Sequence, residues 1–263
     1  MSNLSLTPGW LRRSAGLLRS LIIYRHPFRQ RGLRRLYKPF VRSGGLAFDV
    51  GAHLGDRTRA FSSLGCRVVA CEPQPHLRAW LLRLEGLRPG VTICAAAIGA
   101  ESGRAELAIS QATPTVSTLA TSWRRGIGAA NETFSRVRWE ERIEVPVITL
   151  DELIREHGLP DFCKIDVEGY EEAVLQGVSQ PLPALSIEFV AGSLDDTERC
   201  VKRLEALLAQ APEPSRYRYN VVPGEGRRFL FGAWQAPEDL LGWLARGAGG
   251  YSSGDVYARL EAC

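Results

Sequence analysis

The stretch Leu46-Ala-Phe-Asp-Val-Gly-Ala-His-Leu-Gly55 decides the fold. Its first five residues form a short, mostly apolar run that ends in glycine, which indicates a buried parallel strand leading into a tight turn. Gly51 and Gly55 carry no side chain, so the backbone can approach a ligand closely at this turn. The helix that we expect to begin at Asp56 directs its positive end at the same place. The stretch therefore predicts a strand, a binding turn and a helix.

A second buried strand is predicted for Val68-Val-Ala-Cys71, and Glu72 follows it directly. A carboxylate at the carboxyl end of that strand can accept hydrogen bonds from both hydroxyls of a ribose. The pattern then predicts a helix over 76–86 and a third buried strand over 91–97. Three strand–helix repeats indicate a doubly wound α/β sheet that binds its ligand at the carboxyl ends of the strands. We expect the loop that contains Ala97 to lie beside an adenine.

The spacing of the glycines indicates which nucleoside is bound. A dinucleotide site has the pattern G-x-G-x-x-G, because the pyrophosphate lies against backbone N–H groups at the start of the helix. Here Ala52 and His53 stand between the glycines, and Asp49 would repel a pyrophosphate but could receive an ammonium group. S-adenosylmethionine has ribose hydroxyls, an amino-acid end and a sulfonium, and it carries no phosphate, so it fits this pattern better than NAD. A close helix–strand contact without any ligand is the alternative.

Charge is distributed unevenly along the 263 residues. The net charge is +4, yet residues 1–45 contain ten Lys and Arg and no Asp or Glu. Apolar residues recur there at near-helical spacing, and no apolar run reaches the roughly 20 residues of a transmembrane helix. No small-residue cleavage site of a secretory signal follows. We expect a basic helical arm that contacts an anionic membrane or an acidic partner, or that packs on the domain as a helical cap.

Six cysteines, at positions 66, 71, 94, 163, 200 and 263, include no C-x-x-C pair and have no histidine at metal-ligand spacing. This pattern speaks against a structural zinc site and favours a reducing compartment. We therefore expect a cytoplasmic protein, located at the inner face of the membrane if the basic arm binds lipid.

The regular strand–helix alternation breaks over residues 101–149. Strands are predicted over 101–110 and 142–150, with a polar stretch between them that contains Trp123 and Trp139. That stretch is long for a connector, so we predict a lid or substrate loop within a β insertion, and a plain surface loop is the alternative.

The densest chemistry lies in Phe162-Cys-Lys-Ile-Asp-Val-Glu-Gly-Tyr-Glu171. A strand over 162–167 would place Asp166, Glu168 and Glu171 at its carboxyl end. Three carboxylates are costly to place together unless they meet protons, a cation or a substrate. The alternative is structural, since acidic residues also stabilise the positive first turn of a following helix.

Five blocks of sequence, in order and spacing, resemble the FkbM-type S-adenosylmethionine-dependent methyltransferases. They are Asp49-Val-Gly-Ala-His-Leu-Gly55, Cys71-Glu-Pro-Gln-Pro75, Ala96-Ala-Ile-Gly99, Thr149-Leu-Asp-Glu-Leu153 and Lys164-Ile-Asp-Val-Glu-Gly-Tyr-Glu171. The resemblance covers about residues 45 to 190, and His53 stands where such proteins often have asparagine. It implies a class I, Rossmann-like methyltransferase fold with a mostly parallel seven-stranded sheet and an antiparallel C-terminal strand. It also implies methyl transfer to a hydroxyl of a sugar, glycan or polyketide-type small molecule.

A candidate site follows. The residues expected to hold the cofactor are Asp49, Gly51, Ala52, His53, Gly55, Glu72, Ala97 and Asp166. The residues expected to act in catalysis are Asp166, where cofactor and acceptor meet, and Glu168, Glu188 and His53 as candidates for the base. Glu188 ends a predicted strand over 184–190 and should point into the same crevice. Carboxylates suit magnesium, so the binding of a divalent cation by Asp166 and Glu188 is a further alternative.

The rest of the chain predicts a helix over 197–209, a strand pair over 217–222 and 228–234, and a helix over 237–246. We therefore divide the chain into a basic arm (1–45), a methyltransferase domain (46–250) and a C-terminal tail (251–263).

Two other functions stay open. The basic arm would suit a nucleic-acid methyltransferase, but the sequence contains no Asn-Pro-Pro-aromatic or Pro-Cys motif, so we expect no nucleic-acid partner. The other is a non-catalytic domain that binds S-adenosylmethionine or membrane, and the presence of Asp49, Glu72 and Asp166 speaks against it. The acceptor expected is a hydroxyl of a small molecule or glycan, and the oligomeric state is not indicated.

Overall fold

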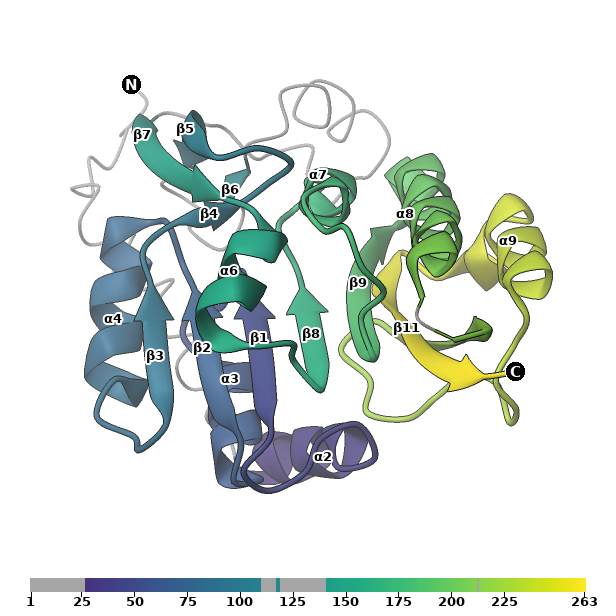
Figure 1. The fold of residues 1–263 in the computed structure, drawn as a ribbon, viewed down its shortest axis with the longest axis horizontal. Helices are drawn as coiled ribbons and strands as arrows, with labels where there is room; N and C mark the ends of the chain where they lie inside the picture. The colour runs from purple at the N-terminus through teal and green to yellow at the C-terminus, as the bar shows by residue number, and fades with distance from the viewer. Residues whose placement is uncertain (1–26, 110–116, 119–140, 212) are drawn as a thin grey trace, which may run out of the picture.

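A seven-stranded sheet forms the centre of the molecule (Figure 1). The computed structural model describes residues 27–109, 117–118, 141–211 and 213–263. The strands of the central sheet are β1 (Leu46–Val50), β2 (Arg67–Cys71), β3 (Val91–Cys94), β8 (Phe162–Ile165), β9 (Ala184–Val190), β10 (Ser215–Pro223) and β11 (Ser253–Ala262). They lie in the order β10-β11-β9-β8-β1-β2-β3.

The direction of the strands identifies the topology. Strands β1, β2, β3, β8 and β9 are parallel, whereas β11 is antiparallel to both of its neighbours, β9 and β10. This confirms the mostly parallel, doubly wound sheet with an antiparallel C-terminal strand that is expected of a class I methyltransferase. The chain leaves β1 toward β2 on one side and later returns to β8 on the other, which opens a crevice at the carboxyl ends of these strands.

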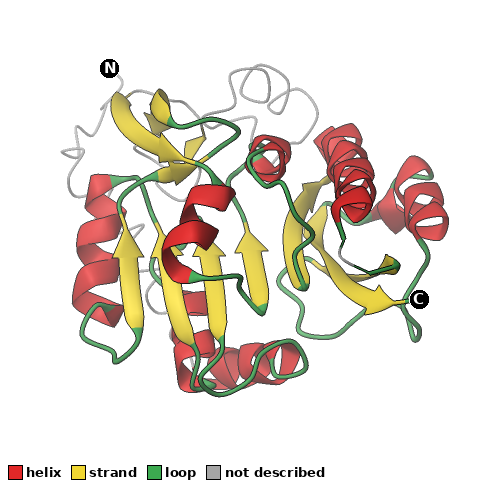
Figure 2. Cartoon of the chain, viewed as in Figure 1, coloured by secondary structure: helices red, strands yellow, loops and turns green. Residues whose placement is uncertain are grey.

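Helices cover both faces of the sheet (Figure 2). One face carries α2 (Pro27–Tyr37), α3 (Asp56–Ser63) and α4 (Pro75–Glu85), and the other carries α6 (Leu150–His157), α7 (Glu171–Gln176), α8 (Leu194–Leu207) and α9 (Pro237–Ala245). Strand β1 shows the division, because Ala47 belongs to the apolar cluster of α2 and α3 and Phe48 to that of α6 to α9. Since every residue of β1 is buried, its sequence is a nearly continuous apolar run.

The described part of the basic N-terminal segment, residues 27–45, contains α2, which packs on the domain. Leu33, Leu36 and Tyr37 are buried in one cluster with residues of α3 and the sheet. Arg29 Nε donates a hydrogen bond to Asp56 Oδ2 at 2.7 Å. Residues 27–37 therefore follow the helical-cap alternative, while the predictions for residues 1–26 lie outside the described part of the chain. No helix in the described ranges is both long and apolar enough to cross a membrane.

The β insertion after β3 forms a second sheet above the carboxyl ends of the main strands (Figure 1). Its strands are β4 (Ala97–Ile98), β5 (Gly103–Ile109), β6 (Ser117–Thr118) and β7 (Glu141–Ile148), in the order β4-β7-β5-β6. The residues expected to form a loop beside an adenine are thus partly strand, because Ala97 pairs with Val147. The predicted lid loop with Trp123 and Trp139 lies outside the described residues.

Two predictions for the C-terminal region are wrong. Strand β10 pairs over its whole length with β11, whose residues were expected to be a tail, whereas residues 228–234 give β10 a single backbone hydrogen bond, from the Leu230 N–H to the Val221 carbonyl. The physical reason is the side chain of Asn220, which accepts a hydrogen bond from the Phe231 backbone N–H and donates one to its carbonyl. Residues 228–234 therefore lie along β10 without forming a ladder, and the domain extends to residue 262.

Candidate active site

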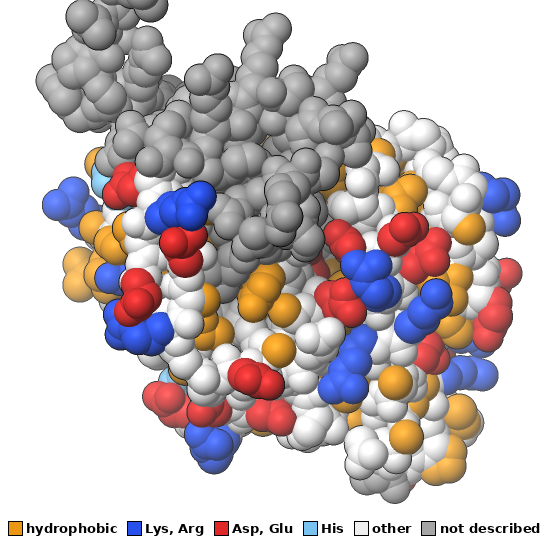
Figure 3. All heavy atoms as spheres, turned by 90° about the horizontal axis from the view of Figure 1, so that it is seen from above, with side chains coloured by type: hydrophobic (Ala, Val, Ile, Leu, Met, Phe, Trp, Pro, Cys, Tyr) orange, Lys and Arg blue, Asp and Glu red, His pale blue; other side chains and the backbone are white. Residues whose placement is uncertain are grey.

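A pocket of about 230 Å³ opens at the carboxyl ends of β1, β2, β8 and β9, below the second sheet. The sequence-predicted residues that line it are Asp49, Gly51, Ala52, His53, Glu72, Ala97, Asp166, Glu168 and Glu188. Seen from above, the coloured part of the surface carries acidic and basic side chains interspersed with hydrophobic ones (Figure 3). The structure thus brings together residues that span 140 positions of the chain, because parallel strands end at one edge.

Gly55, the remaining predicted residue, does not line the pocket. It has a φ of 80°, and a Cβ on it would lie 2.6 Å from Leu81 Cδ1 and 2.8 Å from Glu85 Cγ of α4. Its role is therefore the close packing of α3 against α4. This corresponds to the ligand-free alternative for the second glycine of the turn.

Gly51 brings the turn after β1 against the end of β8. Its φ is 79°, and a Cβ would lie only 1.8 Å from the carbonyl oxygen of Asp166. The N–H groups of Gly51 and Ala52 both donate to the carbonyl of Cys71, which fixes the turn beside β2. The missing side chain thus lets the turn after β1 lie directly against the backbone at the end of β8, where both line the pocket.

Glu72 is held rigidly at the end of β2. Its Oε2 accepts a hydrogen bond from the His53 N–H at 2.9 Å, and its Oε1 accepts one from the Gln74 N–H at 2.9 Å. Each carboxylate oxygen retains a second lone pair that can accept a further hydrogen bond. Burial raises the pKa of Glu72 to about 7, although the two backbone donors oppose the shift. Two oriented acceptors at this position suit the paired hydroxyls of a ribose.

Asp49 is buried and serves the fold as well as the pocket. Its Oδ2 accepts a hydrogen bond from the hydroxyl of Thr58, in the first turn of α3, at 2.5 Å. Burial raises the pKa of Asp49, and the Thr58 hydrogen bond opposes this shift. A carboxylate that faces the pocket and is anchored to α3 remains available to a positively charged group.

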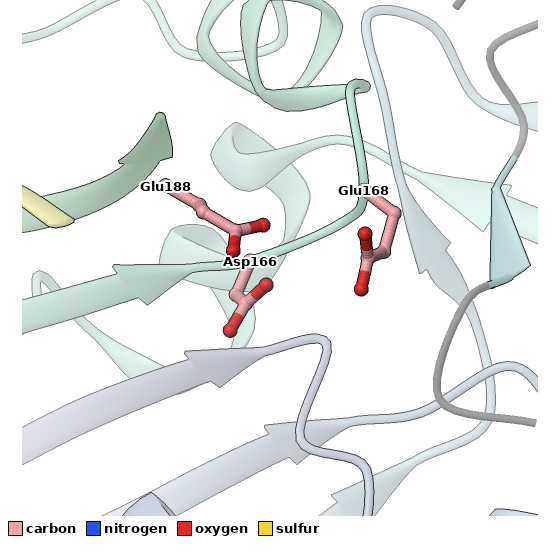
Figure 4. A group of neighbouring side chains, drawn as sticks. All are labelled: Asp166, Glu168 and Glu188. Carbon is pink, nitrogen blue, oxygen red and sulfur yellow. The ribbon is translucent and has the colours of Figure 1, made fainter. Parts of the chain in front are cut away.

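Three acidic side chains converge where β8 and β9 end (Figure 4). Asp166 follows β8, Glu168 lies in the next loop with a φ of 54°, and Glu188 is on β9. One oxygen of each carboxyl group lies within 4.8 Å of the others. These oxygens are of the type that Mg²⁺ prefers, so the described chain offers a candidate cation site as well as candidate bases.

The buried ammonium group of Lys164 compensates part of the negative charge of these carboxyl groups. Its side chain is 1% exposed, and its Nζ lies 2.8 Å from Asp166 Oδ2 and 3.4 Å from Asp255 Oδ1. Burial alone would raise the pKa of Asp166, but Lys164 and then Arg57 outweigh burial and lower it. Asp166 is therefore the ionised member of the group, and Asp255 on β11 is a partner that the sequence analysis missed.

The other two carboxyl groups differ from Asp166. Burial, reinforced by the Asp166 charge, raises the pKa of both Glu168 and Glu188 well above the ordinary value. Each of them therefore holds a proton more tightly than Asp166 does, and its ionised form is a stronger base than an ordinary carboxylate. Burial lowers the pKa of His53 to about 4, so His53 is neutral at pH 7 and only weakly basic.

Glu171 has a structural task. Its Oε1 accepts hydrogen bonds from the N–H groups of Val167 at 3.0 Å and Gly169 at 3.4 Å. It thereby fixes the loop that presents Glu168, and it does not join the three carboxyl groups that face the pocket. Glu171 therefore has a structural role, which is to hold the loop before α7.

The FkbM-type methyltransferase model, described as "Methyltransferase FkbM domain", matches residues 49–198, which is more than half of the chain. The chain belongs to the FkbM methyltransferase family. It is therefore an S-adenosylmethionine-dependent methyltransferase. The matched span contains the turn after β1 with Gly51. It also contains Glu72 and the three converging carboxyl groups, whereas Asp255 lies beyond it.

Solved structures similar to this FkbM protein include a TehB-like SAM-dependent methyltransferase from Corynebacterium glutamicum, with 12% identity, a TM-score of 0.46, and 97% of this chain and 100% of that chain covered. An O-methyltransferase from Bacillus cereus in complex with SAH has 13% identity and a TM-score of 0.42, with coverages of 99% and 94%. A putative O-methyltransferase from Klebsiella pneumoniae has 12% identity and a TM-score of 0.43, with coverages of 99% and 93%. No curated protein matches the sequence.

The residues of the FkbM site fit this cofactor. Glu72 offers two oriented acceptors, and the backbone of Gly51 and Ala52 lines the pocket beside it. Because Asp49 faces the same pocket, the site suits a ligand with hydroxyls and positive charge and opposes one with a pyrophosphate.

Proposed function

We propose that this protein transfers the methyl group of S-adenosylmethionine to a hydroxyl oxygen of a small molecule or glycan. One observation carries the proposal: two carboxyl groups with raised pKa, Glu168 and Glu188, stand beside an ionised Asp166 at the end of the cofactor pocket. An alcohol that gains a methyl group must lose a proton. A carboxylate whose pKa is raised holds the accepted proton more tightly than an ordinary carboxylate does, so it is suited to take it.

The residues that would hold the cofactor line the pocket at the carboxyl ends of β1 and β2 and at β4. Glu72 would accept hydrogen bonds from the ribose hydroxyls, and Ala97 would lie against the adenine. Gly51 and Ala52 would support the amino-acid part with their backbone, and Asp49 would receive its ammonium group. The bound cofactor supplies an electrophilic methyl group.

The residues of the protein would align the acceptor hydroxyl with the methyl group and remove its proton. In-line displacement requires the acceptor oxygen opposite the departing sulfur, so that a C–O bond forms as the C–S bond breaks. The carboxylate of Glu168 or Glu188 takes the hydroxyl proton, while Asp166, fixed by Lys164, orients the acceptor. His53 is the weaker candidate base because its pKa is about 4.

A divalent cation on the same three carboxylates is the second way to activate a hydroxyl. Their oxygens, within 4.8 Å of one another, would bind it, and the cation would lower the pKa of a coordinated alcohol. Lys164 already compensates Asp166 in part, which reduces the need for a metal. Contact of residues 1–45 with a membrane also stays a prediction.

The test is to incubate the purified protein with S-adenosylmethionine carrying a ¹³C-labelled methyl group and a metabolite extract of its source cells. The chemical shift of the transferred carbon distinguishes a methyl group on oxygen from one on nitrogen or carbon. A labelled methyl ether is expected, and its formation should persist after dialysis against a chelator if no cation takes part. A product labelled on nitrogen or carbon would contradict the proposal.

A further inference from the structure

Two cysteines lie side by side where the central sheet meets the pocket. Cys71 is the last residue of β2 and lines the pocket, and Cys94 is the last residue of β3, the edge strand of the sheet. The two residues are direct partners in the parallel pairing of β2 and β3. Both side chains belong to the apolar cluster on the sheet face that carries α6 to α9. The structure thus places two thiols on one face, in neighbouring strands and at the same level.

The other four cysteines are not paired in this way in the described sheets. Cys163 on β8 is in register with Phe48 and Leu185. Three lie outside the strands, namely Cys66, Cys200 and Cys263. Any chemistry between two thiols of one molecule therefore points to the pair on β2 and β3.

Cys94 is the more reactive member of the pair. Its sulfur accepts hydrogen bonds from the thiol of Cys71 and from the N–H of Ala96, which lower the pKa of Cys94 to about 7 although burial opposes the shift. The contact with Cys94, together with burial, raises the pKa of Cys71 well above its ordinary value. Cys94 is half-buried, whereas Cys71 is fully buried. Since the thiolate is the nucleophile, an oxidant reacts first with Cys94, and Cys71 lies beside it as the second thiol.

The spacing of the two strands permits a covalent bond between these thiols. Neighbouring strands lie about 4.8 Å apart, which is within the range of about 4.4–6.8 Å between the Cα atoms of a disulfide. The Cβ atoms of a disulfide lie closer, at about 3.8 Å on average, so the ends of β2 and β3 must approach each other when the bond forms. A disulfide that has to draw two strands together is strained and therefore easily reduced.

Backbone groups at the cofactor pocket depend on the position of the two cysteines. The carbonyl of Cys71 accepts hydrogen bonds from the N–H groups of Gly51 and Ala52, at 3.0 and 2.9 Å. The carbonyl of Cys94 accepts one from the N–H of Glu72 at 3.0 Å. A shift of the strand ends would therefore move the turn after β1 and the carboxylate of Glu72, which we expect to hold the ribose.

We propose that Cys71 and Cys94 form a reversible disulfide when hydrogen peroxide oxidises the protein, and that this modification weakens the binding of S-adenosylmethionine. In the first step the sulfur of Cys94 attacks a peroxide oxygen, so that an S–O bond forms, the O–O bond breaks and Cys94 becomes a sulfenic acid. In the second step the sulfur of Cys71 attacks the sulfur of Cys94, so that an S–S bond forms and the S–O bond breaks. The two thiols lose two electrons and two protons in total, and the peroxide is reduced to two molecules of water.

The first experiment looks for the bond itself. The full-length Cys263→Ser protein is used, because Cys263 is exposed and can cross-link two molecules. After treatment with hydrogen peroxide, free thiols are alkylated in denaturant, and tryptic peptides are analysed by mass spectrometry without reduction. Trypsin separates the two cysteines, since Arg78 and Arg83 lie between them.

A linked pair of peptides that contain Cys71 and Cys94 is expected, and dithiothreitol should separate it. Two results would overturn the proposal. One is Cys94 oxidised to a sulfinic or sulfonic acid while Cys71 stays free to be alkylated. The other is that both thiols survive the peroxide unchanged.

The second experiment measures the affinity for S-adenosylmethionine by isothermal titration calorimetry before oxidation, after oxidation and after reduction with dithiothreitol. The disulfide is expected to weaken binding by about tenfold or more, as for the loss of a hydrogen bond to a charged group, and reduction should restore it. Unchanged affinity in protein whose disulfide has been detected would overturn the effect on binding. Neither readout involves the acceptor, so failure here leaves the proposed O-methylation standing.

Two matched variants in the Cys263→Ser protein assign the effect to this pair. Cys94→Ala removes the thiol that reacts first, so peroxide should no longer weaken cofactor binding. Cys200→Ala removes a thiol of α8 that has no place in the strand pairing, so peroxide should weaken binding as in the parent protein. An equal loss of affinity in Cys94→Ala and in the parent would mean that oxidation at a different residue is responsible, and the proposal would be wrong.

Discussion

Lys164 and Asp255 come from strands that are not neighbours in the sheet, yet their charged groups lie 3.4 Å apart. Strand β9 runs between β8 and β11, and the small side chain of Ser186, in register with Lys164, leaves room for the contact. The ion pair links β11, in the C-terminal region, to β8, which ends at the site of the proposed chemistry.

Removing the Lys164 charge should destabilise the fold. We expect Lys164→Met to lower the free energy of unfolding by about 3 kcal/mol, because Asp166 and Asp255 would lose a buried cationic partner. Asp255→Asn should cost less, about 1 kcal/mol, since Lys164 retains Asp166. Urea unfolding measures both, with Glu261→Gln on the same strand as the control. Equal stability of wild type and Lys164→Met would show that this ion pair adds nothing to the fold.

Gly51 and Gly44 form a matched pair for testing the close contact between the turn after β1 and the end of β8. Both have a φ of 79°, but a Cβ on Gly51 would lie 1.8 Å from the Asp166 carbonyl, whereas one on Gly44 would meet nothing within 4 Å. Gly44→Ala should therefore cost about 1 kcal/mol from the backbone alone, and Gly51→Ala about 3 kcal/mol or more. Chemical unfolding checks the difference. Similar losses in the two variants would mean that the turn after β1 can move away from β8.

Glu72 should matter for cofactor binding. Glu72→Ala is expected to weaken the affinity for S-adenosylmethionine by about 1 to 3 kcal/mol through the loss of hydrogen bonds to the ribose. Isothermal titration calorimetry measures this, and S-adenosylhomocysteine serves as a second ligand with the same ribose. Affinity equal to that of the wild type would exclude Glu72 from the cofactor site.

Glu168 and Glu188 should affect turnover more than binding. Replacing the base by glutamine is expected to lower kcat by about 10²-fold or more, with cofactor affinity nearly unchanged. The variant of the base should also lose the acid limb of the pH–rate profile, which a variant that only disturbs packing would retain. If neither variant shows this behaviour, the base is a different residue.

The buried Glu72 also predicts how stability depends on pH without cofactor. Its pKa is about 7 in the folded protein, whereas the ordinary value for a glutamate in water is 4.5, so the folded state binds the proton more tightly than the unfolded chain does. The stability that this proton provides is complete below about pH 4.5 and is lost as the pH rises through 7, with an upper limit of about 3 kcal/mol. Urea unfolding at several pH values should therefore show a steeper decline in the wild type than in Glu72→Gln. Parallel declines would mean that Glu72 does not titrate in this range.

The sequence predicted those parts of the fold that are local. Strands β1, β2 and β9 are short apolar runs, and Glu72 and Glu188 could be placed because parallel strands end at a common edge. Gly55 could not be assigned, since glycine at that spacing serves equally for ligand approach and for helix packing. The lid expected between residues 111 and 142 stays a prediction.

The C-terminal pairing could not be read from local patterns. Residues 217–222 and 228–234 look like a hairpin, but the side chain of Asn220 takes over hydrogen bonds that a ladder would need. The true partner of β10 lies some forty residues further along the chain, and contacts at that separation leave no periodic signal. The contact of Asp255 with Lys164 was hidden for the same reason.

Strand β11 follows every other strand in the chain and yet lies inside the sheet, between β9 and β10. During translation, β10 leaves the ribosome with no edge to join, because residues 253–262 must emerge and insert first. Until then Lys164 has only Asp166 as a partner. The nascent protein therefore cannot complete its sheet before residues 253–262 have been added, and Lys164 gains its second partner only with Asp255 among them.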